Sequence, residues 1–159
     1  MALESISETI QRLHPYEEPA WDVYALQPKP RNGSGQGRSV KLNRSISINA
    51  LVDRIKQHLK LKQVRLARAG SGPVKTVALC AGAGGSVLEG HRADVYLTGE
   101  MRHHDILDAN ARGTSVILTD HTNTERPYMP VLKKRLQKLL GNQVAIDISK
   151  RDADPLKIF

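Results

Sequence analysis

The sequence of 159 residues contains a single cysteine, few aromatic residues and no long apolar run. One cysteine excludes a disulfide scaffold, and the apolar segment VKTVALC makes Cys80 typical of a small core residue. Aromatic residues form 4% of the chain, which argues against a stacking platform for single-stranded nucleic acid. No segment has the length of a membrane span, and the amino terminus lacks the pattern of a secretory signal. These absences predict a cytoplasmic protein, with the nucleus as an alternative.

Basic residues outnumber acidic residues by 24 to 16, which gives a net charge of +8. They are dense between positions 38 and 75 and again at Lys133, Lys134, Arg135 and Lys138. Such an excess attracts phosphate groups, so nucleic acid is one candidate partner. The charges also lie opposite apolar stripes, as they do on solvated helix faces, and this second interpretation is favoured.

A region rich in proline and glycine divides the chain into two parts. Residues 1–28 predict a helix at 3–13, which ends before Pro15, and a strand at 20–26. Residues 29–38 hold prolines and glycines and are interpreted as a linker. One helix and one strand cannot form a core, so we expect the first 28 residues to dock on another domain.

Residues 39–159 show alternating signals for helices and strands. Helices are predicted from a cap at Ser47 to residue 59, at 103–112 and at 124–140. Strands are predicted at 64–66, 74–80, 95–97, 115–118 and 144–148. This order predicts a layered α/β domain with a mixed sheet.

A glycine loop, AGAGGS, follows the most apolar predicted strand. Its backbone amides could bind an anion, but the loop lacks the lysine and hydroxyl residue of a Walker motif. A tight turn into a short helix, with Ser86 and Glu89 at capping-box spacing, is the favoured interpretation.

The most informative segment is DHTNTER, at the end of a predicted strand. His121 and Glu125 supply an imidazole and a carboxylate, which are ligands for divalent metals, at the edge where open α/β sheets place functional groups. The alternative is a capping box formed by Thr122 and Glu125. Pro127 argues against that alternative, because it would then lie inside the helix rather than in its first turn. Two ligands do not complete a site, so metal binding and a structural role stay open at this point.

Further candidates follow the preceding predicted strand. Glu100 and His104 could supply more ligands, and Asp108 lies four residues after His104, where it could orient the imidazole. The alternative is a solvated helix start, where Glu100 is favoured by the helix dipole. The pattern does not decide between them.

Four separated motifs resemble those of one known family. The ordered set HPYEEPAWDVYAL, ALCAGAGGSVL, DVYLTGEMRHHDILDA and DHTNTER resembles the Nif three-like family, also known as GTP cyclohydrolase I type 2 homologues. The resemblance is close from about residue 39 to residue 159 and looser over the first 28 residues. Asp120 departs from the family, in which glycine often precedes the histidine, and this departure puts little of the resemblance in doubt.

The resemblance implies a fold of two similar α/β halves, often with an inserted domain between them, assembled as a homo-oligomer, typically a ring-shaped hexamer. Two divalent ions lie between the halves, and zinc, iron and manganese are the candidates. His121 and Glu125 match two of the family's metal ligands, whereas the other ligands belong to an amino-terminal half. The sequence looks like a carboxyl-terminal half, with residues 1–28 as the tail of the inserted domain.

The resemblance also implies a function. The expected activity is that of a dinuclear-metal-dependent hydrolase, with Glu100 or His104 as a proton shuttle, and this chain alone should bind metal weakly and be inactive. One alternative is a non-catalytic module for protein interaction or transcriptional regulation, with protein partners. A second is nucleic-acid binding through the basic faces.

Overall fold

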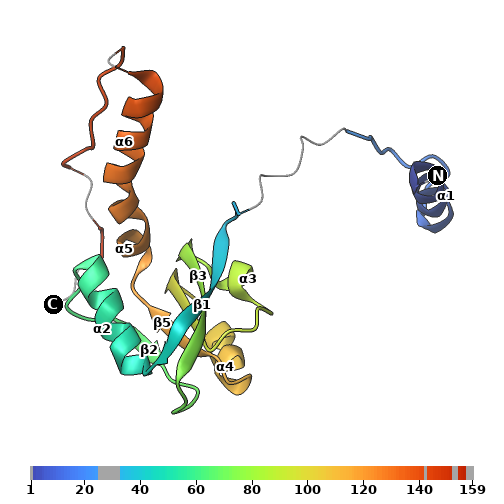
Figure 1. The fold of residues 1–159 in the computed structure, drawn as a ribbon. Helices are drawn as coiled ribbons and strands as arrows, with labels where there is room; N and C mark the ends of the chain where they lie inside the picture. The colour runs from blue at the N-terminus through green and yellow to red at the C-terminus, as the bar shows by residue number, and fades with distance from the viewer. Residues whose placement is uncertain (1, 25–32, 142, 152–153, 157–159) are drawn as a thin grey trace. The chain divides into compact units, whose positions relative to one another are not determined.

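The computed structural model describes residues 2–24, 33–141, 143–151 and 154–156 (Figure 1). The chain forms two compact units, Met1–Ser34 and Gly35–Phe159, which are described separately. Within the described residues, no helix is both long and apolar enough to cross a membrane.

The first unit contains one helix, α1 (Ala2–Leu13), as predicted. Its apolar residues Leu3, Ile6 and Leu13 are exposed within the unit. The predicted strand at 20–26 is wrong for residues 20–24, which form a loop, while residues 25 and 26 lie outside the described residues. Alternating apolar residues give a strand only where a neighbouring strand pairs their backbone groups. The assignment of residues 1–28 to an inserted domain stays a prediction.

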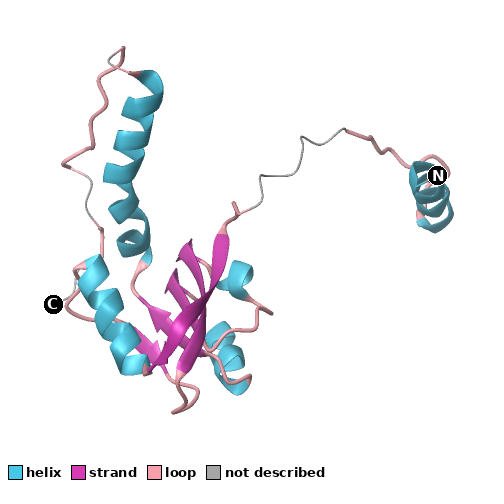
Figure 2. Cartoon of the chain, viewed as in Figure 1, coloured by secondary structure: helices cyan, strands magenta, loops and turns pink. Residues whose placement is uncertain are grey.

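The second unit is built on a five-stranded mixed sheet (Figure 2). Its strands are β1 (Gly37–Ile46), β2 (Arg65–Ala67), β3 (Val74–Ala83), β4 (Val95–Glu100) and β5 (Ser115–Leu118), in the order β1-β3-β4-β5-β2. The central strands β3, β4 and β5 are parallel, and β1 and β2 join the edges in antiparallel orientation. This sheet confirms the predicted α/β class. Strand β1 was not predicted, because its exposed positions carry basic and polar residues and its sequence shows no clear alternation.

Helices cover both faces of the sheet (Figure 1). Helix α2 (Ile48–Leu59) begins at Ser47, whose side chain accepts a hydrogen bond from the Ala50 amide, as the predicted cap requires. Its buried residues pack with Val77 and Ile117 on one face. Helices α3 (Gly85–Leu88) and α4 (His103–Ala111) pack on the other face, where Leu88 and Ala109 are buried. Neighbouring strand residues alternate between these two clusters, so the sheet is buried on both sides.

Three details of the predicted helices and strands are wrong. The capping box at Ser86 and Glu89 does not form, because Gly84 is the N-cap residue of α3. The long helix at 124–140 is divided into α5 (His121–Glu125), a 3₁₀ turn η1 (Arg126–Tyr128) and α6 (Met129–Leu140). Pro127 lies in the 3₁₀ turn, where its missing amide interrupts the regular helical bonding. The predicted strand at 144–148 is a bend and a loop.

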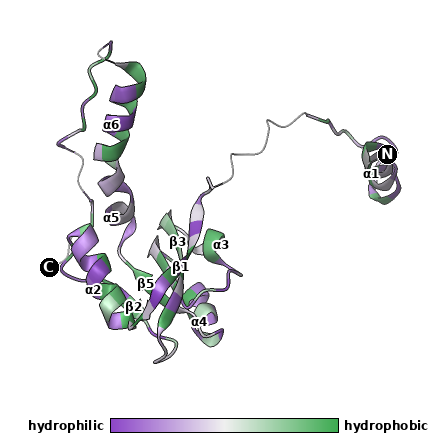
Figure 3. Cartoon of the chain, in the orientation of Figure 1, coloured by the Kyte–Doolittle hydropathy of each residue, from purple (hydrophilic) through white to green (hydrophobic). Residues whose placement is uncertain are grey.

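Helix α6 differs from α2 in its packing. None of its residues is buried, and Met129, Val131, Leu139 and Leu140 are exposed. Figure 3 shows apolar residues along this helix beside polar ones. An amphipathic helix whose apolar side meets no core is typical of a surface that binds another molecule.

Candidate metal site

Three strand ends come very close together at the carboxyl edge of the sheet. A Cβ atom built on Gly99 would lie 2.8 Å from the Gly82 carbonyl oxygen, 2.8 Å from the His121 Cα and 2.9 Å from the Asp120 carbonyl oxygen. All three neighbours are backbone atoms, so no side chain fits at Gly99. This close approach brings the end of β4 against the residues that follow β5.

Two threonine hydroxyls hold this edge together. The buried Thr98 hydroxyl donates to the Gly82 carbonyl at 2.9 Å and accepts from the Gly84 amide at 2.9 Å. The Thr124 hydroxyl accepts from the Gly82 amide at 2.7 Å and donates to the His121 carbonyl at 2.7 Å. The second pair of bonds ties α5 to the end of β3. The Gly82 and Gly84 amides are therefore already bonded, which agrees with the favoured interpretation of the glycine loop as a tight turn.

Asp120 turns the chain from β5 into α5 with an unusual backbone conformation. Its φ is 65° and its ψ is 152°, a region that is essentially restricted to glycine. Its carboxylate accepts a hydrogen bond from the Arg65 guanidinium at 2.8 Å. Aspartate in place of glycine therefore gives the residue before His121 a strained backbone.

His121 is the first residue of α5, and its ring lies between two carboxylates. The Nδ1 atom is 3.4 Å from Glu100 Oε2, and the Nε2 atom is 3.3 Å from Glu125 Oε1. The three side chains are 43–55% exposed, so the group opens to solvent. The structure thus brings together three of the four residues that the sequence singles out, from the end of β4 and from α5.

A glycine leaves space beside this group. Gly82 has a φ of +67°, and a Cβ atom there would lie 2.8 Å from Glu125 Oε1 and 3.0 Å from His121 Nε2. Imidazole nitrogen and carboxylate oxygen are suitable ligands for zinc, iron and manganese. His121, Glu125 and the space at Gly82 therefore fit part of a divalent-metal shell.

The group is not a complete site. Across the described parts of the chain, no three or more His, Cys, Asp or Glu side chains are placed to hold an ion by themselves. The two carboxylates face different nitrogens of one ring, which explains why Glu100, His121 and Glu125 do not converge on one point. Further ligands have to come from other residues.

His104 lies apart from this group. It lines a separate hollow with Asp108 and Arg112, and its ring centre is 5.9 Å from that of His103. Asp108 pairs with Arg112 at 2.8 Å, so it does not take the predicted role of orienting His104. Cys80 is buried, and this burial raises the pKa of its thiol, which agrees with its interpretation as a core residue.

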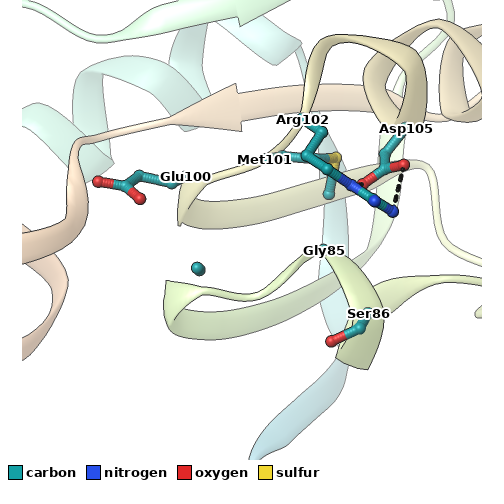
Figure 4. A pocket seen from close by; sticks show the side chains of 7 residues that line it. Gly85, Ser86, Glu100, Met101, Arg102 and Asp105 are labelled. Carbon is teal, nitrogen blue, oxygen red and sulfur yellow. Dashed lines mark hydrogen bonds and ion pairs between the residues drawn. The ribbon is translucent and has the colours of Figure 1, made fainter.

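A cavity of about 490 Å³ adjoins the group through Glu100. Ala83, Gly85, Ser86, Met101, Arg102 and Asp105 form the rest of its lining. Arg102 pairs with Asp105 at 3.0 Å across the cavity wall, and Figure 4 shows Glu100 pointing away from that ion pair. The cavity gives a small molecule access to one side of the site.

The sequence analysis missed four residues that shape the site, namely Gly82, Thr98, Gly99 and Thr124. The segment LTGE carries two of them, and a strand that ends in a small hydroxyl residue and a glycine indicates close packing of strand ends. Their contacts join positions that are 14 to 42 residues apart, so local patterns could not show them.

Comparison with known proteins identifies relatives over most of the chain. The model of the family described as Duf34/NIF3 (NGG1p interacting factor 3) matches residues 3–155. NIF3-like protein 1 of Rattus norvegicus is 50% identical to this chain, and the match covers 86% of this chain and 38% of the rat protein. NIF3-like protein 1 of Bos taurus is also 50% identical, and the match covers 79% of this chain and 34% of the bovine protein. A solved Bacillus cereus protein related to NIF3 is 25% identical, with a TM-score of 0.63 over 99% of this chain and 44% of that chain. The chain thus spans less than half the length of these relatives.

Proposed function

Because the chain belongs to the Duf34/NIF3 family, we propose that it contributes His121 and Glu125 to a divalent-metal site of a hydrolase. The observation that carries this proposal is the pairing of His121 Nε2 with Glu125 Oε1 at 3.3 Å beside the space that Gly82 leaves. Residues outside this chain complete the shell, as the partial coverage of the relatives allows.

Each residue has a distinct task in this proposal. His121 and Glu125 hold an ion, and the Thr124 hydroxyl keeps α5 in place against Gly82. A bound pair of ions would supply Lewis acidity and an activated water for attack on a phosphate ester or a ring carbon. Glu100 borders both the metal group and the cavity, so it is the better placed of the two proposed proton carriers. His104, in its separate hollow, is not retained in that role.

Metal uptake tests the proposal. Zn²⁺ or Mn²⁺ binding is measured for this chain alone and after mixing with the part of the rat relative that the chain does not match. We expect weak binding by the chain alone and stoichiometric uptake by the mixture, with both lost in His121→Ala and Glu125→Gln. His104→Ala is the matched control and should bind as the unchanged chain does. Equal metal uptake by all four proteins would exclude His121 and Glu125 as ligands.

Helix α6 favours a second function, in which the chain serves as an interaction module. Its exposed apolar residues, including Leu139 at 79% exposure, offer a surface for a second copy of the chain. Sedimentation velocity should then show self-association that Leu139→Lys weakens and that Gln137→Lys, on the same helix, leaves unchanged. A monomer at all concentrations would exclude this surface as a self-association site.

A further inference from the structure

The two carboxylates beside His121 are not equivalent. Glu125 shares α5 with His121, four residues along the chain, whereas Glu100 is the last residue of β4. Glu100 pairs in register with Ala83 of β3, so its backbone is fixed by the sheet. One carboxylate therefore belongs to the same helix as the imidazole, and the other belongs to the rigid edge beneath it.

The space for an ion lies on one side of the ring. Gly82 leaves space next to His121 Nε2 and Glu125 Oε1. A Cβ atom built on Gly82 would lie 3.0 Å from the Nε2 atom and 2.8 Å from the Oε1 atom. Glu100 lies at the opposite nitrogen, Nδ1, at 3.4 Å. Arg102, which lines the same cavity as Glu100, is paired with Asp105, so it does not draw Glu100 away from the ring.

An imidazole that binds a metal through one nitrogen carries its proton on the other. In metal sites that proton is commonly donated to a carboxylate, which fixes the orientation of the ring and makes the ligand nitrogen more basic. The separation of 3.4 Å between Nδ1 and Oε2 is longer than a charge-assisted hydrogen bond, and such separations shorten when a site is loaded.

We propose that Glu100 is a positioning residue that accepts the Nδ1 proton of His121 and so presents Nε2 to an ion shared with Glu125. This inference rests on the proposed metal-binding function and revises the role of Glu100 from proton carrier to orienting carboxylate. Each residue of the TGE segment then has a role. Thr98 and Gly99 bring the end of β4 against His121, and Glu100 lies beside the imidazole ring.

Two conservative substitutions separate the roles of the carboxylates. In Glu100→Gln the amide oxygen can still accept the Nδ1 proton, whereas Glu100→Ala removes the acceptor. Glu125→Gln replaces a ligand carboxylate with a poor ligand. The probe is Zn²⁺, titrated into the unliganded chain while the ¹⁵N shifts of the His121 ring are followed by NMR, which reports affinity and the position of the ring proton together.

We expect Glu100→Gln to stay within a few-fold of the unchanged chain and Glu100→Ala to lose about 10- to 100-fold in Zn²⁺ affinity. Glu125→Gln should show no Zn²⁺-dependent shift, and the loaded unchanged chain should carry its proton on Nδ1. A Glu100→Gln protein as impaired as Glu125→Gln would make Glu100 a ligand, overturning this inference while leaving the proposed function intact. Zn²⁺ bound through Nδ1 would also overturn it. Absence of Zn²⁺ binding by the unchanged chain, both alone at millimolar concentration and after mixing with the part of the rat relative that it does not match, would overturn both.

Discussion

Carboxylates at the two edges of the parallel strands have different partners. At the amino edge, Asp94 accepts hydrogen bonds from the Lys75 and Thr76 amides at 2.7 Å each and from the Thr76 hydroxyl at 3.0 Å. At the carboxyl edge, Glu100 and Glu125 lie at 3.4 Å and 3.3 Å from the two nitrogens of one imidazole. The Oδ2 atom of Asp94 thus accepts three hydrogen bonds from within the fold and stabilises it. The second pair retains oxygen atoms for a ligand.

Backbone packing differs between the edges as well. Side-chain hydrogen bonds join both edges, through Asp94 at the amino edge and through Thr98 and Thr124 at the carboxyl edge. The carboxyl edge depends in addition on Gly99, where no side chain fits. At the carboxyl edge, hydrogen bonds and a close approach of the backbone therefore act together. At this edge the side chains of Glu100, His121 and Glu125 remain open to solvent.

The largest expected effect comes from filling the close approach at the carboxyl edge. Gly99→Ala places a methyl group 2.8 Å from two backbone atoms that cannot move without separating the strand ends. We expect a loss of about 3 kcal/mol in the free energy of unfolding, measured by urea denaturation. Gly72→Ala, with no atom within 4 Å of the added group, is the control and should change stability by about 0.5 kcal/mol or less. Equal stability of the two variants would show that the edge yields more readily than the geometry indicates.

A smaller loss is expected at the amino edge. Asp94→Ala removes the acceptor of three hydrogen bonds, so about 2 kcal/mol should be lost at neutral pH. Asp94→Asn keeps an acceptor oxygen and should lose less. Under conditions where both variants are folded, their Zn²⁺ binding at the carboxyl edge should equal that of the unchanged chain.

Asp94 should also make the free energy of unfolding depend on pH. Burial raises the pKa of Asp94, but the hydrogen bonds from Lys75 and Thr76 outweigh it, and the net pKa lies below its ordinary value. Asp94 therefore stabilises the fold above its unfolded pKa of about 3.9, and this contribution is lost as pH falls through the lower folded pKa. The difference in unfolding free energy between the unchanged chain and Asp94→Asn should shrink below about pH 4. A difference that stays constant down to pH 2 would contradict this assignment.

An intermediate effect is expected at Thr98, beneath the candidate site. Thr98→Val keeps the shape of the side chain and leaves the Gly82 carbonyl and the Gly84 amide without their bonds. We expect a loss of about 1–2 kcal/mol and weaker Zn²⁺ binding. Thr98→Ser retains the hydroxyl and should restore binding, which separates the hydrogen bonds from the packing of the methyl group.

The smallest effect is a gain in stability. Asp120→Gly relieves a conformation that costs about 1–3 kcal/mol for a residue with a side chain. Part of that gain is offset, because glycine increases the conformational entropy of the unfolded chain and because the exposed ion pair between Arg65 and Asp120 is lost. Each of these two effects costs up to about 1 kcal/mol. A rise in unfolding free energy of up to about 1 kcal/mol is expected. Asp120→Ala keeps the positive φ and loses the pair, so it should be less stable than the unchanged chain.

Local patterns predicted much of the second unit. The cap at Ser47, the buried strand β3 and the strand at 115–118 follow from capping and hydrophobic signals that need no distant partner. The failures at 20–24, at 144–148 and at β1 share one cause. Whether an extended segment becomes a strand depends on a neighbour that pairs with it, and that neighbour is far away in the sequence.

For the site, the amino-acid sequence by itself determined which chemistry is present: an imidazole, two carboxylates and a glycine loop near the ends of predicted strands. Only the tertiary structure decided which of these groups meet. It placed Glu100 beside His121 and moved His104 to another hollow, because strand order and the close approach at Gly99 fix the distances. It also made Asp120 a strained residue, since the turn from β5 into α5 demands a backbone conformation that its residue type does not favour.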